Sequence, residues 1–342
     1  MSMGISAKMK KVVVPIVMSF VLLLAPGSSL LPLSADIDTS QPVNLIVQWM
    51  PQSQFAGYYV AYDKGFYKDH GVNVTVLRGG PDRDPTEYIQ SGKAQFATMF
   101  LSTAIVSRTK EIPLVNIAQV INRSNLMVVA WKDKGINSVK ELSGRRVSFW
   151  GDTFNAAFLG LRNRYRLSVN YIPQNYSVNL FLNKGVDACA AMYYNEYNML
   201  YQSGVNEDEL STFFMRDEGF GFPEDGIYCL ESTWKKDPKL CKNIADASLE
   251  GWQYAKDHSE EALDIVMKYV NESHVPTNRV HMKWMLNKIV ESIFPGPSDS
   301  WDFGKLSSLD YYATASALKT NKIFAGETPL YETFYKNQMA TK

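Results

Sequence analysis

Two sets of residues in this sequence follow apolar segments and have the chemistry to bind a small molecule. In the first set, Trp49 ends one such segment, and its indole ring can stack on a flat ligand or simply pack at the rim of a core. Ser102 and Thr103 follow another segment and begin a predicted helix. Their hydroxyls and the free backbone N–H groups of that helix suit an anionic or carbonyl oxygen. Plain capping of the helix is an equally good interpretation, and both roles can hold together.

The second set stands in the equivalent place of the later half of the chain. Trp150 ends another apolar segment and is a second candidate for stacking. The polar residues of a helix start, Asp152, Thr153 and Asn155, come directly after it. Two helix N-termini that face each other across a cleft would hold a polar ligand from both sides.

Acidic and aromatic residues complete the candidate site. Tyr193, Tyr194 and Glu196 follow a third apolar segment, where a buried Glu196 would accept hydrogen bonds from ring amino or imide N–H groups. An exposed Glu196 would only stabilise the dipole of its helix. Glu224 and Asp225 stand where the chain returns to its first half, and they either contact the ligand or cap a turn.

Neither catalytic nor metal-binding chemistry has a recognisable pattern here. The spacing of Cys189, Cys229 and Cys241 fits no zinc site. A disulfide between Cys229 and Cys241 and a pair of buried free thiols are both compatible with the sequence. The four histidines stand in hydrophilic contexts without a Cys, Ser or Glu arrangement typical of catalysis. We therefore expect no catalytic residue, no metal and no cofactor.

Strands and helices alternate along the chain, and their order predicts an α/β fold with two lobes. The expected strands cover residues 43–47, 72–76, 95–100, 114–120, 126–131, 146–150, 169–172, 187–192, 212–215 and 226–231. From Asp237 onward the pattern is helical. Two crossings, near Trp131 and near Asp225, would join residues 36–130 plus 226–342 (lobe 1) to residues 131–225 (lobe 2). Such a clamshell binds ligand in the cleft and closes by a hinge.

The first 35 residues predict a secretory signal peptide and a periplasmic location. Lys8, Lys10 and Lys11 precede an apolar run from Val12 to Ala25, which is short for a membrane span. Cleavage after Ala35 would leave a slightly acidic chain, which gives no support for nucleic-acid binding. An uncleaved signal anchor is the alternative.

Several phrases of the sequence resemble one family of proteins. They are WMPQSQFAGYYVAYDKGFYKDHGVNV at Trp49–Val74, SGKAQFA at Ser91–Ala97, IPLV at Ile112–Val115, VKELSGRRV at Val139–Val147 and GVDA at Gly185–Ala188. The chain resembles the periplasmic substrate-binding proteins of ABC importers, in the NMT1/THI5-like branch of thiamine-pyrimidine-precursor-binding proteins and pyrimidine synthases. The resemblance implies the type II clamshell, a small planar nitrogen-containing ligand and a membrane permease as partner of a monomeric receptor.

The chain departs from the family pattern in two features that bear on function. A His commonly stands in the pyrimidine-related proteins about where Phe55 stands here, and the synthases also carry a Cys-rich cluster that this chain lacks. The resemblance therefore implies a binding protein rather than an enzyme. A synthase-like enzyme, a periplasmic sensor subunit, and a receptor for a flavin or a sulfonate stay open as alternatives.

Overall fold

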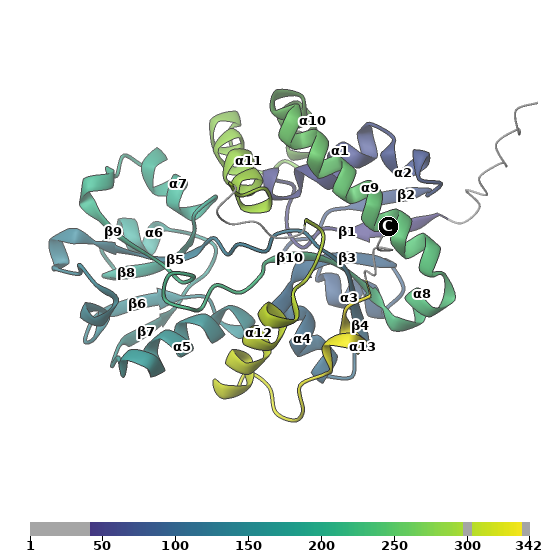
Figure 1. The fold of residues 1–342 in the computed structure, drawn as a ribbon. Coiled ribbons are helices and arrows are strands. Elements are labelled where there is room, and N and C mark those ends of the chain that lie inside the picture. Colours follow the sequence, from purple (N-terminus) through teal and green to yellow (C-terminus); the bar gives the residue numbers. More distant parts are fainter. Residues whose placement is uncertain (1–41, 297–302, 337–342) are drawn as a thin grey trace, which may run out of the picture. The chain divides into compact units, whose positions relative to one another are not determined.

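The structure, a computed structural model, describes residues 42–296 and 303–336. The expected signal peptide lies outside these residues. No helix within the described ranges is both long and apolar enough to cross a bilayer. All of the described residues belong to one unit, Asp38–Lys342. Its α/β fold is built on two mixed sheets of five strands each (Figure 1).

The first sheet contains mainly buried apolar strands, in the order β2-β1-β3-β10-β4. β1 pairs in parallel with β2 and β3, whereas β10 is antiparallel to both of its neighbours. The strands are β1 (Val43–Ile46), β2 (Val74–Leu77), β3 (Phe96–Phe100), β4 (Leu114–Gln119) and β10 (Asp225–Leu230). β10 follows β9 (Leu210–Phe214), the last strand of the second sheet in chain order. The chain therefore returns to complete the first sheet after it has formed the second.

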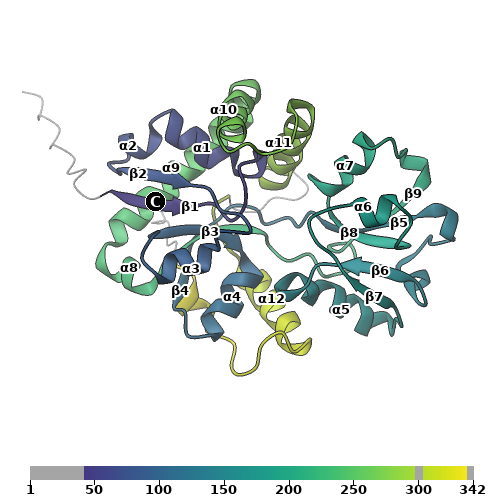
Figure 2. The same ribbon diagram turned by 180° about the vertical axis from the view of Figure 1, so that it is seen from behind.

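Helices cover both faces of the first sheet (Figures 1 and 2). On one face lie α1 (Ala56–Asp63), α2 (Phe66–Asp69), α9 (Pro238–Asp257) and α10 (Ser259–Glu272), and on the other lie α3 (Pro85–Gln90), α4 (Leu101–Thr109), α12 (Ser308–Thr320) and α13 (Tyr331–Phe334). α8 (Glu231–Lys236) follows β10. α1 and α9 pack closely because Gly57 has no side chain; a Cβ atom there would stand 2.3 Å from the Trp252 ring.

Local signals in the sequence explain where several of these helices begin and end. Asp84 caps α3 by accepting from the N–H groups of Thr86 and Glu87, and Pro85 occupies the first helical position. Gly65 separates α1 from α2 in the left-handed conformation, with φ of 84°. Both boundaries therefore follow from residue types that are visible in the sequence.

The second sheet has the order β7-β6-β8-β5-β9. β6 pairs in parallel with β7 and β8, and β5 is antiparallel to β8 and β9. Its strands are β5 (Leu126–Trp131), β6 (Arg146–Phe149), β7 (Asn170–Pro173), β8 (Ala188–Met192) and β9 (Leu210–Phe214). α5 (Asn155–Tyr165) covers one face, and α6 (Asn179–Leu182) with α7 (Glu196–Gln202) covers the other (Figure 1).

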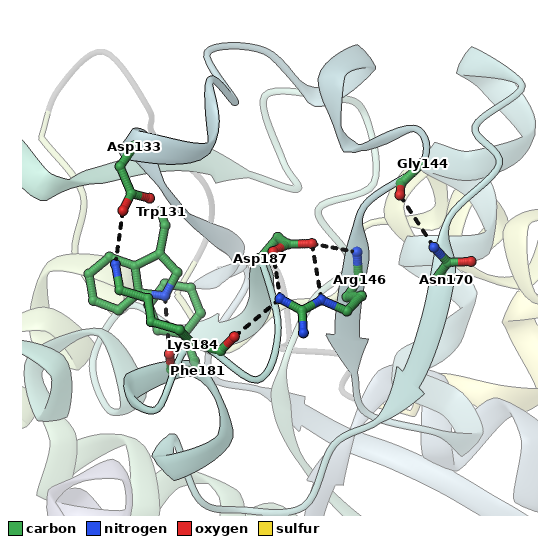
Figure 3. Close-up of polar contacts among 8 residues, drawn as sticks. All are labelled: Trp131, Asp133, Gly144, Arg146, Asn170, Phe181, Lys184 and Asp187. Atoms are coloured by element: carbon green, nitrogen blue, oxygen red, sulfur yellow. Dashed lines mark hydrogen bonds and ion pairs between the residues drawn. The ribbon is translucent and has the colours of Figure 1, made fainter.

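Polar contacts at the amino ends of β6 and β8 hold this sheet together (Figure 3). Asp187 accepts from the backbone N–H of Arg146 at 2.9 Å and from its guanidinium at 2.9 Å. The Arg146 side chain also donates to the carbonyl of Lys184. Burial alone would raise the pKa of Asp187, but the bonds from Arg146 outweigh it and lower that pKa. This ion pair lies at the opposite ends of the strands from the residues predicted to bind ligand.

Two segments connect the sheets, and a buried carboxylate ties them to each other. Glu224 in the second crossing accepts from the backbone N–H and the side-chain amide of Asn125 in the first crossing. Leu126 begins β5, whose pairing with β8 and β9 places residues 126–130 in the second sheet. The first crossing therefore precedes Leu126, five residues earlier than the sequence suggested, because β5 inserts between two strands of the second sheet.

The C-terminal helices also connect the two halves. In α11 (Arg279–Ile293), His281 bonds to Asn195 at 2.9 Å and Trp284 donates to the carbonyl of Tyr193 at 3.1 Å. Asn321, which follows α12, bonds to Asn163 in α5 at 2.7 Å. Cys229 and Cys241 are buried free thiols in this structure, with their Sγ atoms 3.8 Å apart.

Candidate ligand-binding site

A cavity of about 480 Å³ lies where strands of both sheets end, at their carboxyl edges. This is the volume and the place typical of a small-molecule site in an α/β protein. Segments after β1 and β3 and the start of α3 form one wall, and segments after β6, β7 and β8 form the other. The lining includes Gln48, Trp49, Gln52, Gln54, Asp84, Phe100, Thr103, Trp150, Phe154, Tyr176, Tyr194, Asn195 and Glu196.

Aromatic rings provide most of the flat surface of the cavity. Trp49 from the first wall lies 5.6 Å from Tyr176 of the second, measured between ring centroids, with the ring planes 57° apart. Trp150 packs against Phe154, which in turn meets Phe100 edge to face at 4.9 Å. The structure thus brings Trp49 and Trp150, the two predicted stacking residues, into one cavity.

Glu196 is the acidic group of the second wall. Its side chain is only 5% exposed, and it accepts from the backbone N–H of Met192 at 2.9 Å and from the Asn195 amide at 2.8 Å. Burial raises the pKa of Glu196 to about 7, although these two donors lower it. A carboxylate held in this way can accept further hydrogen bonds from a ligand, and doing so would favour its charged form.

The Asp225 carboxylate lies behind the first wall rather than in the cavity. It is 1% exposed, and it accepts from the side-chain amides of Gln48 and Gln54, both of which line the cavity. Asp225 begins β10 between β3 and β4, so the sheet encloses it. The residue therefore acts on the cavity through the glutamines and not by direct contact.

Glu224 likewise stays outside the main cavity. It lines a small adjoining space of about 30 Å³, together with Ser102 and Thr153. Burial raises the pKa of Glu224 to about 7, and its partners Asn125 and Ser124 belong to the first crossing. These contacts make it a link between the two crossings.

The two predicted helix starts contact each other through their threonine side chains. The hydroxyls of Thr103 and Thr153 are 3.0 Å apart and share a hydrogen bond. Thr103 lies at the edge of the main cavity, whereas Ser102 and Thr153 face the smaller one. The segment that carries Thr153 is a short 3₁₀ turn, Asp152–Phe154, so α5 begins only at Asn155.

Besides Ser102, Thr153, Glu224 and Asp225, two further predicted residues, Tyr193 and Asn155, are not among the described residues that line the main cavity. Tyr193 points away from it and packs on Trp284 and Phe214, because successive residues at a strand end face opposite sides of the sheet. Tyr194, the next residue, does line the cavity. Asn155 is partly buried, and its Oδ1 has no hydrogen-bond partner among the described residues. The side chain of Asp152 lies outside the described part of the chain.

Sequence reasoning missed the amide groups and the rings of Phe100, Phe154 and Tyr176. Gln48, Gln52 and Gln54 flank Trp49 and line the cavity, and Tyr176 reaches it from the segment after β7. The signal for the glutamines was present, since three of them fall within seven residues around the tryptophan in QWMPQSQ. Tyr176 is 64% exposed and follows the amides Gln174 and Asn175, so a similar local signal was present there as well.

Comparison with known proteins places this geometry in a family. Residues 52–262 match the model described as "NMT1/THI5 like", which is more than half of the chain. The chain belongs to the NMT1/THI5-like family. This match confirms the resemblance carried by the phrases at Trp49–Val74 and Ser91–Ala97.

Relatives with known names are distant in sequence. The chain is 23% identical to the formylaminopyrimidine-binding protein of Halalkalibacterium halodurans over 71% of this chain and 75% of that one. It is 25% identical to the riboflavin-binding protein RibY of Chloroflexus aurantiacus over 69% of each. A 4-amino-5-hydroxymethyl-2-methylpyrimidine phosphate synthase of Legionella pneumophila is 24% identical over 32% of this chain and 35% of its own length. The family members similar to this chain thus include both binding proteins and synthases.

Solved structures confirm the predicted fold. The periplasmic aliphatic sulphonate binding protein SsuA of Escherichia coli superposes with a TM-score of 0.67 at 11% identity, over 87% of this chain and 98% of that one. The alkanesulfonate-binding protein SsuA of Xanthomonas axonopodis pv. citri, solved with MOPS, gives a TM-score of 0.64 at 12% identity, over 86% and 98%. This NMT1/THI5-like chain therefore has the type II periplasmic-binding-protein fold.

Proposed function

We propose that this protein is an extracytoplasmic solute-binding protein that captures a small, planar, nitrogen-containing ligand and delivers it to an ABC importer. The observation that carries the proposal is the composition of the 480 Å³ cavity. Its walls combine the rings of Trp49, Trp150 and Tyr176 with amide groups and the carboxylate of Glu196. Rings stack on a flat ligand, and oxygen acceptors bind its N–H groups.

The charge of the cavity supports a neutral or cationic ligand. None of its described lining residues is Lys, Arg or His, whereas Asp84 and Glu196 are acidic. A sulfonate would meet two carboxylates without a cation to compensate, which costs binding energy. A pyrimidine related to thiamine precursors is the first candidate, and a flavin is the second; relatives that bind formylaminopyrimidine and riboflavin support both.

Binding without chemical conversion fits the side chains of the site. Phe55 is fully buried in the apolar core, at the position where the synthase resemblance implies a His. An apolar side chain at that place cannot transfer a proton. This supports a receptor over a synthase-like enzyme.

The proposed mechanism is closure of two lobes around the ligand. The lobes would be those expected from the sequence, residues 36–130 plus 226–342 and residues 131–225, except that all of β5 (Leu126–Trp131) belongs to the second lobe. Contacts such as Trp49 with Tyr176 and Thr103 with Thr153 join the walls of the site. A ligand that touches both walls binds the closed form selectively, and that form would present both lobes to the permease.

One set of experiments tests the proposal. Isothermal calorimetry should detect binding of a thiamine-type aminopyrimidine or riboflavin and no binding of an alkanesulfonate. Small-angle scattering with the bound compound should give a smaller radius of gyration, and product analysis should recover that compound unchanged. Sulfonate binding would contradict the ligand class, while multiple turnovers of a bound pyrimidine would contradict the receptor role.

Export and oligomeric state form a separate part of the proposal. We expect a monomer in the periplasm whose chain starts near Asp36. Mass spectrometry of the exported protein and light scattering check both points. Retention of residues 1–35 would instead support the signal-anchor alternative.

A further inference from the structure

We infer that Asp225 sets the hydrogen-bonding polarity of the first cavity wall, so that the site selects ligands that present hydrogen-bond donors to it. The inference rests on the proposed function and makes its ligand class more specific. It assigns Asp225 as a positioning residue, because its carboxylate reaches the cavity only through glutamine side chains that line it.

A carboxylate dictates the orientation of the amides around it. An ionised carboxylate accepts hydrogen bonds and cannot donate them, so an amide that meets it must turn its nitrogen towards it. Asp225 Oδ1 accepts from Gln48 Nε2, and Oδ2 accepts from Gln54 Nε2 at 3.0 Å. Burial and the neighbouring Glu224 raise the pKa of Asp225 well above its ordinary value, and the N–H groups of Gln54 and Gln48 oppose this rise without cancelling it. Both oxygens of Asp225 nevertheless accept from amide nitrogen in the structure, as those of an ionised carboxylate do. The two amides are therefore the groups that favour its charged form.

The orientation passes along a chain of side chains. Because Gln54 turns its nitrogen to Asp225, its oxygen is available and accepts from Gln52 Nε2 at 2.6 Å. Gln54 is 3% exposed and Gln52 is 9% exposed, so water competes little for these bonds. We call the chain Gln52, Gln54, Asp225 and Gln48 the glutamine relay.

The relay leaves two oxygen atoms for a ligand. Gln48 Oε1 and Gln52 Oε1 accept no hydrogen bond from any described residue, and both side chains line the cavity. Glu196 adds a carboxylate from the opposite wall. A ligand edge with an amino or ring N–H group would pair with these acceptors. A ligand edge with an ether or carbonyl oxygen would face these acceptor oxygens instead. Burial of that ligand oxygen without a hydrogen-bond donor costs binding energy.

Two nearly isosteric probes separate donor from acceptor. They are 2-methyl-4-(methylamino)pyrimidine, which presents an N–H group, and 2-methyl-4-methoxypyrimidine, which presents an oxygen in the same place. Ligand-observed NMR titration gives both dissociation constants. The wild-type protein should prefer the methylamino probe by about tenfold or more, since one buried acceptor is satisfied or left unpaired.

The variant Asp225→Asn offers one acceptor and one donor to the two glutamines, so one of them can turn its nitrogen to the cavity. We expect the preference to fall to roughly threefold or less. Asp187→Asn is the matched control, because Asp187 is also a buried carboxylate but lies at the far ends of β6 and β8 with Arg146 (Figure 3). It should lose stability and keep the preference. An unchanged preference in a folded Asp225→Asn protein would overturn the inference.

A measurement without ligand tests the relay independently of the proposed function. In ¹⁵N-labelled protein, the side-chain amide resonances of Gln48 and Gln54 should show slowed hydrogen exchange in the wild type and in Asp187→Asn. In Asp225→Asn at least one of these two side-chain amides should lose its protection from hydrogen exchange. If both amides exchange freely in the wild type, the relay is absent. If they are protected but neither pyrimidine binds, the relay stands and the proposed ligand class fails.

If Asp225→Asn does not fold, Gln52→Met replaces it in the binding test. Met removes the terminal acceptor of the relay and leaves the carboxylate with both of its direct partners. The preference for the methylamino probe should then fall, and an unchanged preference would overturn the role of the relay.

Discussion

The two walls of the cavity each depend on a buried acid, but they use it differently. In the second wall Glu196 itself lines the cavity and accepts from Met192 and Asn195. In the first wall Asp225 lies behind the lining and acts through Gln48 and Gln54. The difference shows that an acid at a strand end can serve as a contact or as a support, depending on which layer of side chains separates it from the ligand.

The strongest test of this comparison removes the charge that faces the ligand. Glu196→Gln should weaken binding of an aminopyrimidine by roughly 1.5–3 kcal/mol, the contribution of a hydrogen bond to a charged acceptor. Calorimetry measures the loss. Glu207→Gln, an exposed acid elsewhere on the second half of the chain, is the control and should bind normally. Full affinity in Glu196→Gln would mean that the second wall acts by its rings alone.

The pH dependence of stability probes the same acids without a ligand. Burial raises the pKa of Glu196 and of Glu224 to about 7, above the value of 4.5 for an ordinary Glu. Between those values the folded protein holds protons that the unfolded chain releases, so the free energy of unfolding should fall as pH rises. Each group contributes at most about 1.4 kcal/mol per pH unit.

Chemical denaturation at pH 5, 6 and 7 measures this slope, and Glu196→Gln should flatten it. A slope that is the same in the variant would contradict the shifted pKa of Glu196. Because a ligand donor would favour the charged carboxylate, binding near pH 6 should also release protons. Calorimetry in buffers of different ionisation enthalpy detects that release.

Removal of the ring from the first wall should have a smaller effect. Trp49→Ala should lose roughly 1 kcal/mol of binding energy beyond the lost contact area, because the stack on the ligand disappears. Trp49→Phe should recover part of it. Trp234→Phe, in a helix remote from the cavity, is the control for fluorescence changes. If affinity stays unchanged in a folded Trp49→Ala protein, the first wall contributes through its amides only.

The smallest effect is expected where the two walls touch. Thr153→Val removes the hydroxyl that bonds to Thr103 while keeping the shape of the side chain. Affinity should fall by about 0.5–1.5 kcal/mol if this hydrogen bond stabilises the closed form. Small-angle scattering of the free variant should show a more open molecule. Unchanged affinity and radius of gyration would assign the bond to packing alone.

Much of the fold could be read from the sequence because its signals are local. Apolar runs predicted all ten strands of the described residues, and the capping pair Asp84 and Pro85 fixed the start of α3. The crossing before β5 was placed too late, because only strand pairing shows that Leu126–Trp131 lies between β8 and β9. Strand pairing joins residues far apart in the chain, and no local pattern encodes it.

The sequence by itself determined which segments end in stacking and hydrogen-bonding side chains: Trp49, Trp150, Tyr194 and Glu196 all stand at or just after the ends of predicted strands, and all line the cavity. Only the tertiary structure decided which of the two acids lines the cavity. Asp225 and Glu196 both carry a carboxyl group. Asp225 begins β10, which is enclosed between β3 and β4, whereas Glu196 begins α7, beyond the carboxyl end of β8. Side-chain chemistry is a property of the chain, while its access to a ligand depends on the layers that pack around it.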